Sequence, residues 1–190
     1  VKIDALRKRY GEIEALSGVS VTLYEGEFIA ILGENGSGKT TLVKHLNGLL
    51  IPDGGTIFVR SHNAATAPVI ELVKEAGLVF QNPDTMLFAD SVKDEIMFGL
   101  ENIGSANPDQ VISDVLNMVG LSGSESTYPR HLSRGERQRL AVACILAMKP
   151  GIIILDEPTT GLDEIESDRM MDLMLTLQKR GHTIIMVTHN

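Results

Sequence analysis

A glycine-rich segment at residues 33–40 has the composition and spacing of a loop that cradles phosphate groups. Its sequence fits the pattern G-x-x-x-x-G-K-[ST] at every fixed position. Glycines let the backbone curl so that successive N–H groups point at phosphate oxygens, and the positive end of a following helix adds to the attraction. We expect Lys39 to reach the β and γ phosphates and the Thr40 hydroxyl to ligate Mg²⁺. The residues expected to line the site are Gly33, Glu34, Asn35, Gly36, Ser37, Gly38, Lys39, Thr40 and Thr41.

Two adjacent acids, Asp156 and Glu157, follow the apolar run Ile152–Leu155. In open parallel sheets, ligands bind outside the carboxyl ends of the strands. Asp156 is suited to hold Mg²⁺ directly or through water, and Glu157 is suited to polarise an attacking water as a general base. The pair alone could equally open a solvated turn. The phosphate loop favours the catalytic interpretation, because both features would then lie at the same sheet edge.

The strands that must position these groups are short, apolar and mostly β-branched, which is typical of strands buried on both faces of a parallel sheet. They are expected at Phe28–Leu32, Gly77–Phe80, Ile152–Leu155 and Thr183–Val187. The first third of the chain contains other β-forming runs, Val19–Tyr24 and Thr56–Arg60, separated by turn signals. The pattern predicts an α/β fold with an additional β part near the N-terminus.

Helical periodicity and capping signals separate the apolar strands. The expected helices are Lys39–Leu50, Ser91–Leu100, one beginning at Asn107–Pro108, Ser133–Met148 and Asp163–Arg180. Ser133 and Glu136 have the spacing of a capping box. Because residues from about 84 to 150 are mostly helical, we interpret them as a helical subdomain inserted between two core strands.

The composition of the 190 residues is that of a globular domain, with 43% hydrophobic and 22% charged residues. A net charge of −8 disfavours non-specific binding to nucleic acid or to an anionic lipid surface, so no direct nucleic-acid partner is expected. A single cysteine, Cys144, excludes a disulfide within the chain and fits a reducing cytosol. No apolar run is long enough to span a membrane, so membrane work would require a partner.

Four further stretches resemble the motifs of ABC-type ATPases, in the order in which that family carries them. Residues 132–138, Leu-Ser-Arg-Gly-Glu-Arg-Gln, resemble the signature L-S-G-G-Q. Gln81 closes a strand as the family's Q-loop glutamine does, and Gly161-Leu162-Asp163 is similar to the D-loop. His189 closes the last apolar strand as the switch histidine does.

The resemblance implies a P-loop NTPase fold with a RecA-like parallel sheet core, an N-terminal antiparallel β subdomain and an inserted helical subdomain. It implies one domain over residues 1–190, with the core at 1–83 and 151–190 and the helical subdomain at about 84–150. Family members usually continue beyond the last strand, so we expect the C-terminal end of the usual domain to be missing. The implied activity is MgATP hydrolysis, with two ATP molecules held between two ATPase subunits of identical or different sequence.

The resemblance also implies roles for single residues. Tyr10 would stack on adenine, Gln81 would touch Mg²⁺ and the attacking water, and His189 would contact the γ phosphate. The signature would act on the ATP of the second subunit, and its contacting residues would be Ser133, Gly135 and Glu136. Asp163 would lie at the seam between the subunits.

Plainer interpretations of these residues remain open. Tyr10 could be an ordinary strand aromatic, Gln81 and His189 could be polar strand ends, and Ser133 could serve only as a helix cap. Two positions depart from the signature, with Arg134 in place of glycine and Glu136 in place of glutamine. Arg134 could reach a phosphate or point to solvent.

Residues 81–88, Gln-Asn-Pro-Asp-Thr-Met-Leu-Phe, resemble the Q-N-P-D-x-Q-L-F stretch of energy-coupling-factor and cobalt-importer ATPases, and Gly99–Asn102 continues the likeness. The resemblance implies uptake of a vitamin or a transition-metal ion through an integral-membrane transporter subunit. The chain would then lie at the cytoplasmic face of the membrane, and would be cytosolic when isolated. Met86 departs from the pattern. The run Met86–Phe88 could line a groove for a partner's coupling helix, or it could belong to the core of the helical subdomain.

Two other functions remain as alternatives. A soluble ABC ATPase of translation or DNA repair is disfavoured, because one compact domain holds both the loop and the acidic pair and no second cassette or basic stretch is present. A regulatory nucleotide binder without activity is disfavoured by the presence of Lys39 and Glu157.

Overall fold

A computed structural model describes residues 1–189 of the chain and divides it into two compact units. The first unit comprises Val1–Leu78, Pro150–Glu157 and the residues from Leu177 onward. The second comprises Val79–Lys149 and Pro158–Thr176. The strands of both sheets belong to the first unit, except for Val79, and most of the helices belong to the second. Our division of the domain at residues 83 and 151 stays a prediction.

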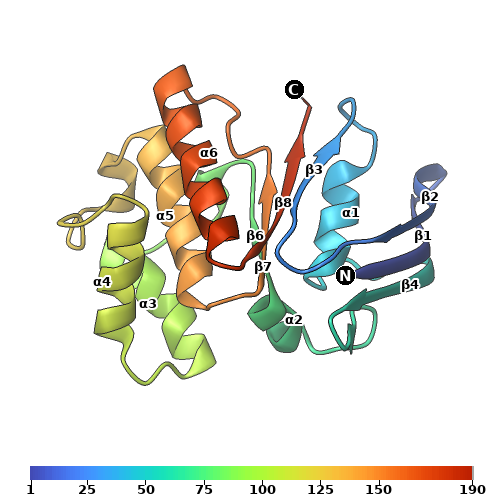
Figure 1. Cartoon of the computed structure of the whole chain (residues 1–190), viewed down its shortest axis with the longest axis horizontal. Coiled ribbons are helices and arrows are strands. Elements are labelled where there is room, and N and C mark those ends of the chain that lie inside the picture. Colours follow the sequence, from blue (N-terminus) through green and yellow to red (C-terminus); the bar gives the residue numbers. More distant parts are fainter. Residues whose placement is uncertain (190) are drawn as a thin grey trace. The chain divides into compact units, whose positions relative to one another are not determined.

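A parallel sheet forms the centre of the first unit. Its strands are β3 (Phe28–Leu32), β8 (Thr183–Thr188), β7 (Ile152–Asp156) and β6 (Ala76–Val79), in that spatial order. Figure 1 shows β3, β8 and β7 side by side, and their pairing is parallel. The four apolar runs of the sequence are thus confirmed as strands. Burial on both faces is wrong for β3, which is an edge strand with Leu32 67% exposed.

A second sheet in the same unit is antiparallel. Its order is β2-β1-β4-β5, and its strands are β1 (Lys2–Tyr10), β2 (Ile13–Thr22), β4 (Gly54–Val59) and β5 (His62–Asn63). Helix α1 (Lys39–Leu46) contacts β2 and β4 of this sheet and β7 of the parallel one. Its expected extension to Leu50 is wrong, because Asn47 is the cap and Gly48 follows with φ 75°. The short helix α2 (Val69–Glu75) was not expected.

The second unit is helical. It contains the 3₁₀ turns η1 (Pro83–Thr85) and η2 (Pro129–His131), and the helices α3 (Val92–Ile103), α4 (Pro108–Met118), α5 (Arg134–Ala147) and most of α6 (Glu164–Lys179). Figure 1 shows α5 beside α3 and α4, which it contacts. The apolar positions that predicted these helices form their core, with Leu100, Leu116 and Leu140 almost completely buried. The predicted α/β fold class is confirmed, with a parallel sheet, an additional antiparallel sheet and helices.

Among residues 1–189, no helix combines the length and the apolar character that a membrane crossing requires.

Candidate nucleotide-binding site

The glycine-rich segment joins β3 to α1 in a tight turn. Gly36 and Gly38 have φ values of 82° and 90°, which residues with a side chain rarely adopt. At Gly38 a Cβ would also collide with the carbonyl oxygen of Ala15 and lie 3.1 Å from Cδ2 of Leu16, both on β2. The antiparallel sheet therefore holds the loop at a point where only glycine fits. The predicted strand–loop–helix arrangement is confirmed.

Lys39 is the first residue of α1, and its side chain folds back over the loop. Its Nζ donates hydrogen bonds to the carbonyl oxygens of Gly33 (2.6 Å) and Glu34 (2.8 Å). These contacts place a positive charge against the loop, at the positive end of the α1 dipole. The arrangement suits the terminal phosphates of a nucleotide, because Nζ could exchange a carbonyl for a phosphate oxygen.

Thr40 and Asp156 meet although they are far apart in the sequence. The Thr40 hydroxyl donates a 2.8 Å hydrogen bond to Oδ2 of Asp156, the last residue of β7. Asp156 is only 6% exposed. Burial raises the pKa of this carboxyl, the hydrogen bond from Thr40 lowers it, and the nearby Glu157 raises it further. A bound cation would offset the energetic cost of burying the negative charge of this carboxylate.

A hydroxyl and one buried carboxylate are hard oxygen donors, which suits Mg²⁺. Residues 1–189 contain no group of three or more His, Cys, Asp or Glu side chains arranged to hold a metal ion. Mg²⁺ is usually bound through one or two carboxylates together with substrate phosphates and water. Thr40 and Asp156 therefore fit the metal that the loop predicts.

The register of the parallel sheet aligns three strand ends at one edge. Leu32 pairs with Thr188, and Asp156 pairs with Val187. The phosphate loop, Glu157 and His189 each follow one of these strands, so the strand ends bring them together.

Glu157 and His189 also touch. Glu157 has φ 49°, an uncommon value for a residue with a side chain, and its N–H donates to the carbonyl of Val187 at 2.9 Å. Its Oε2 lies 3.3 Å from Nδ1 of His189, and the Glu157 side chain is 13% exposed. The strained backbone is a feature often found at functional sites. A carboxylate held in this way beside an imidazole is a suitable base for water.

Tyr10 ends β1, and it pairs with Ile13 in the hairpin that leads into β2. Its ring is 48% exposed, and Nζ of Lys8 lies 6.0 Å from the ring centre. An exposed aromatic on the sheet that touches Gly38 is available for stacking on a base. Its contact with adenine stays a prediction.

The remaining predicted residues lie in the second unit. Ser133 caps α5: its Oγ accepts from the N–H of Glu136 (3.3 Å), and Oε2 of Glu136 accepts from the N–H of Ser133 (2.7 Å). The capping box is confirmed. Asp163 accepts a 2.8 Å hydrogen bond from the N–H of Glu166 in α6, and Gln81 is exposed just after β6. The expected role of each as a nucleotide contact stays a prediction.

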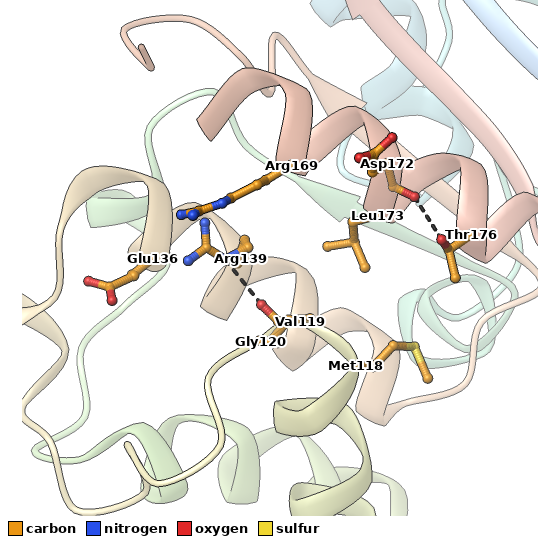
Figure 2. A pocket seen from close by; sticks show the side chains of 9 residues that line it. All are labelled: Met118, Val119, Gly120, Glu136, Arg139, Arg169, Asp172, Leu173 and Thr176. Carbon is orange, nitrogen blue, oxygen red and sulfur yellow. Dashed lines mark hydrogen bonds between the residues drawn. The ribbon is translucent and has the colours of Figure 1, made fainter. Parts of the chain in front are cut away.

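Sequence reasoning missed a charged cluster in the second unit. Glu166 pairs with Arg139 of α5 and, at 2.5 Å, with Arg169 of its own helix. Arg139 also donates through Nε to the carbonyl of Val119 at 3.1 Å. The cluster borders a pocket of about 540 Å³ between α4, α5 and α6, and Figure 2 shows Arg139 and Arg169 together on its wall. The spacing of Glu166 and Arg169, one helical turn apart, was the only available signal.

The chain is similar in sequence to known proteins. A sequence profile described as "ABC transporter" matches residues 16–160. A "Putative ABC transporter ATP-binding protein" of Methanosarcina acetivorans is 61% identical over 100% of this chain, which spans 36% of that protein. The "Energy-coupling factor transporter ATP-binding protein EcfA" of Methanocaldococcus jannaschii is 41% identical over 92% of this chain and 64% of its own length.

Two solved structures are also similar, each with a TM-score of 0.86. One is cbiO1 of Clostridium perfringens, described as part of the ABC transporter complex cbiONQ. It is 34% identical, and the match covers 100% of this chain and 78% of that one. The other is a dimeric post-hydrolysis state of the ATP-binding cassette MJ0796 bound to ADP and Pi, 29% identical over 100% of this chain and 88% of that one. The expected P-loop NTPase fold of ABC ATPases is confirmed.

Proposed function

The chain belongs to the ABC transporter family of ATP-binding proteins, and on this basis we propose that it binds and hydrolyses MgATP to power a membrane transporter. The observation that carries the proposal is the 2.8 Å hydrogen bond between Thr40 of the phosphate loop and Asp156. It brings a phosphate-binding element and an acidic strand end to one point. The presence of Glu157 next to Asp156 adds the base that hydrolysis requires.

In this proposal, the residues of the first unit that surround the phosphates each have a role. The loop N–H groups and Lys39 hold the phosphates, and Thr40 and Asp156 would hold Mg²⁺, which supplies charge neutralisation at the phosphate oxygens when bound. Glu157 accepts the proton of the attacking water. His189, 3.3 Å from Glu157, orients that carboxylate and would contact the γ phosphate.

The second unit supplies the other half of a composite site in our proposal. Gln81 senses the metal and the attacking water, while Ser133, Gly135 and Glu136 face the ATP of a second ATPase subunit. Asp163 lies at the seam. The N-terminus of α5 supports this role, since a capped helix start is itself favourable for an anion. The dimeric state of the similar ATP-binding cassette MJ0796 supports it further.

We further propose that the transporter imports a vitamin or a transition-metal ion and holds this chain at the cytoplasmic face of the membrane. The likeness to EcfA and to cbiO1, which is part of a transporter complex, supports this class. An integral-membrane subunit would be the second partner. The chain spans little more than a third of its Methanosarcina acetivorans relative, so these partners are proposed for the whole protein.

The test of hydrolysis uses the full-length protein with Glu157→Gln. The carboxylate is lost but the shape is kept, so ATP binding should persist while turnover falls by about 100-fold or more. Glu164→Gln, an exposed glutamate at the start of α6, is the matched control and should retain activity. Unchanged turnover in Glu157→Gln would show that another group is the base. A wild-type protein that binds ATP without turnover would favour a regulatory nucleotide binder.

The test of transport is purification of the full-length protein from membranes, followed by identification of the proteins that come with it. An integral-membrane subunit and a second ATPase subunit are the expected partners. A protein recovered without a membrane subunit, or with ribosomes or DNA, would instead favour a soluble ABC ATPase of translation or DNA repair.

A further inference from the structure

Arg134, the residue that departs from the signature pattern, is bound within its own unit. Its guanidinium donates a 3.1 Å hydrogen bond to the carbonyl oxygen of Thr160. The same group covers Gly161, where a Cβ would lie 2.9 Å from Cζ of Arg134 and 3.0 Å from its Nε. Gly161 has φ 75°, so this turn needs glycine for its backbone as well. The signature arginine therefore points at the segment Thr160–Asp163.

A second contact joins the same two segments. Gly135 follows Arg134 in the first turn of α5, and a Cβ at this position would collide with the carboxylate of Glu166. That carboxylate is paired with Arg139 of α5, and the two side chains are only 18% and 10% exposed. An ion pair shielded from water holds its geometry more firmly than a surface pair. The start of α6 is thereby fixed against the first turn of α5.

Residue Asp163 completes the arrangement from the other side. Its Oδ1 accepts from the N–H of Glu166, so the end of the segment Thr160–Asp163 is tied to α6. One end of the segment is thus held by Arg134 and the other by the helix that Glu166 anchors. The two links are the exposed Arg134–Thr160 hydrogen bond and the shielded Glu166–Arg139 ion pair. Only the first can be removed without leaving a buried charge.

We propose that Arg134 is a positioning residue that couples residues Thr160–Asp163 to Ser133–Glu136, so that both segments meet a second ATPase subunit as one surface. The inference rests on the proposed function, which places both segments at the dimer seam. Arg134 acts here through a carbonyl of its own subunit rather than through the phosphate of the partner's nucleotide. The usual glycine at this position could make no such side-chain link.

The direct test measures hydrogen exchange in the ATP-free full-length protein carrying Arg134→Ala. Loss of one charge-assisted hydrogen bond should speed exchange of the amides in residues 160–163 by about fivefold. Arg130→Ala removes the same charge from an exposed arginine of η2, for which the described residues supply no side-chain hydrogen bond or ion pair, and should leave this segment unchanged. Because no nucleotide is present, a phosphate contact of Arg134 cannot produce the result.

Turnover by the same variants tests the functional half. Arg134→Ala should lower kcat by about threefold to tenfold while the affinity of each subunit for ATP stays at the wild-type value. Unchanged exchange in residues 160–163, or an equal change in Arg130→Ala, would overturn the link. Faster exchange in residues 160–163 with an unchanged kcat would show that the link exists but does not contribute to hydrolysis, which would overturn the proposed coupling. Failure of the proposed function would be visible separately, as absence of turnover in the wild-type protein.

Discussion

The Thr40 hydroxyl and the Asp156 carboxylate are joined by a 2.8 Å hydrogen bond across a separation of 116 residues. Thr40 is the second residue of α1, and Asp156 is the last residue of β7. The bond exists because the parallel sheet aligns the carboxyl ends of its strands at the edge where the phosphate loop lies. It supplies a hydrogen-bond donor to a buried acid. The same two oxygens are the proposed Mg²⁺ ligands, and the fold holds them close together.

Asp156→Asn should lower the rate of ATP hydrolysis while making the folded protein more stable. Burial raises the pKa of Asp156 above 3.8, so between that value and the folded-state pKa the native protein binds more protons than the unfolded chain. The free energy of unfolding therefore falls as pH rises through this window, and the buried charge destabilises the protein above it. Asparagine can still accept from Thr40 without that charge. We expect the variant to resist urea better than wild type at pH 7, and hydrolysis to fall by about 100-fold.

Urea unfolding of wild type and of Asp156→Asn is measured in the presence of a metal chelator. The difference between their free energies of unfolding should shrink as the pH is lowered toward 3.8. Asp168→Asn, an exposed carboxylate on α6, is the control and should change neither quantity. A less stable Asp156→Asn protein at pH 7 would mean that Thr40 compensates fully for burial of the charge.

Gly38→Ala should damage the phosphate loop more than an ordinary glycine substitution does. Forcing alanine into the left-handed region costs about 1–2 kcal/mol, and at Gly38 the new Cβ also collides with the Ala15 carbonyl. Gly26→Ala is a matched control, because Gly26 has φ 76° but open space around its missing Cβ. We expect a larger loss of stability in Gly38→Ala than in Gly26→Ala, together with at least about a tenfold loss of ATP affinity in Gly38→Ala alone. Equal effects in both would argue that β2 does not constrain the loop.

The parts of the fold that the sequence predicted are those with a local signal. The run Ile152–Leu155 is apolar and β-branched throughout, and it forms β7 with every residue buried. Ser133 and Glu136 have capping-box spacing, and both bonds of the box are present. A helix start and a central strand each depend on neighbouring residues in the chain, so the pattern is sufficient for them.

Other parts depended on contacts between distant residues. Phe28–Leu32 looks like β7 in sequence, yet it lies at the sheet edge, because periodicity does not reveal how many neighbours a strand has. The sequence pattern predicts only the end of β2, because the part before Val19 carries Glu14, Ser17 and Gly18 among its apolar residues. The ion pair between Glu166 and Arg139 could not be predicted either. Its partner Arg139 lies 27 residues earlier in the chain, and no pattern in the sequence joins the two.

Glu166→Ala should be strongly destabilising. It would leave the guanidinium of Arg139, which is 10% exposed, without its carboxylate. Breaking a shielded ion pair by removing one partner costs about 3–5 kcal/mol, far more than loss of an exposed glutamate. Urea unfolding of Glu166→Ala and of Glu164→Ala, its exposed neighbour on α6, provides the comparison. A difference between the two variants below about 1 kcal/mol would mean that Arg139 finds water or another acceptor.

Ser133→Arg should abolish ATP-driven dimerisation while each subunit still binds ATP. The substitution removes a helix cap, which costs about 0.5–2 kcal/mol, and it places a bulky cation where we propose that the partner's γ phosphate contacts α5. Ser91→Arg separates these effects, because Ser91 caps α3 in the same way, through a 3.1 Å bond from the N–H of Asp94. Size exclusion with ATP, in a Glu157→Gln background that stalls turnover, should show dimers for Ser91→Arg and monomers for Ser133→Arg. Cooperative hydrolysis retained by Ser133→Arg in an otherwise wild-type protein would exclude the signature from the second subunit's site.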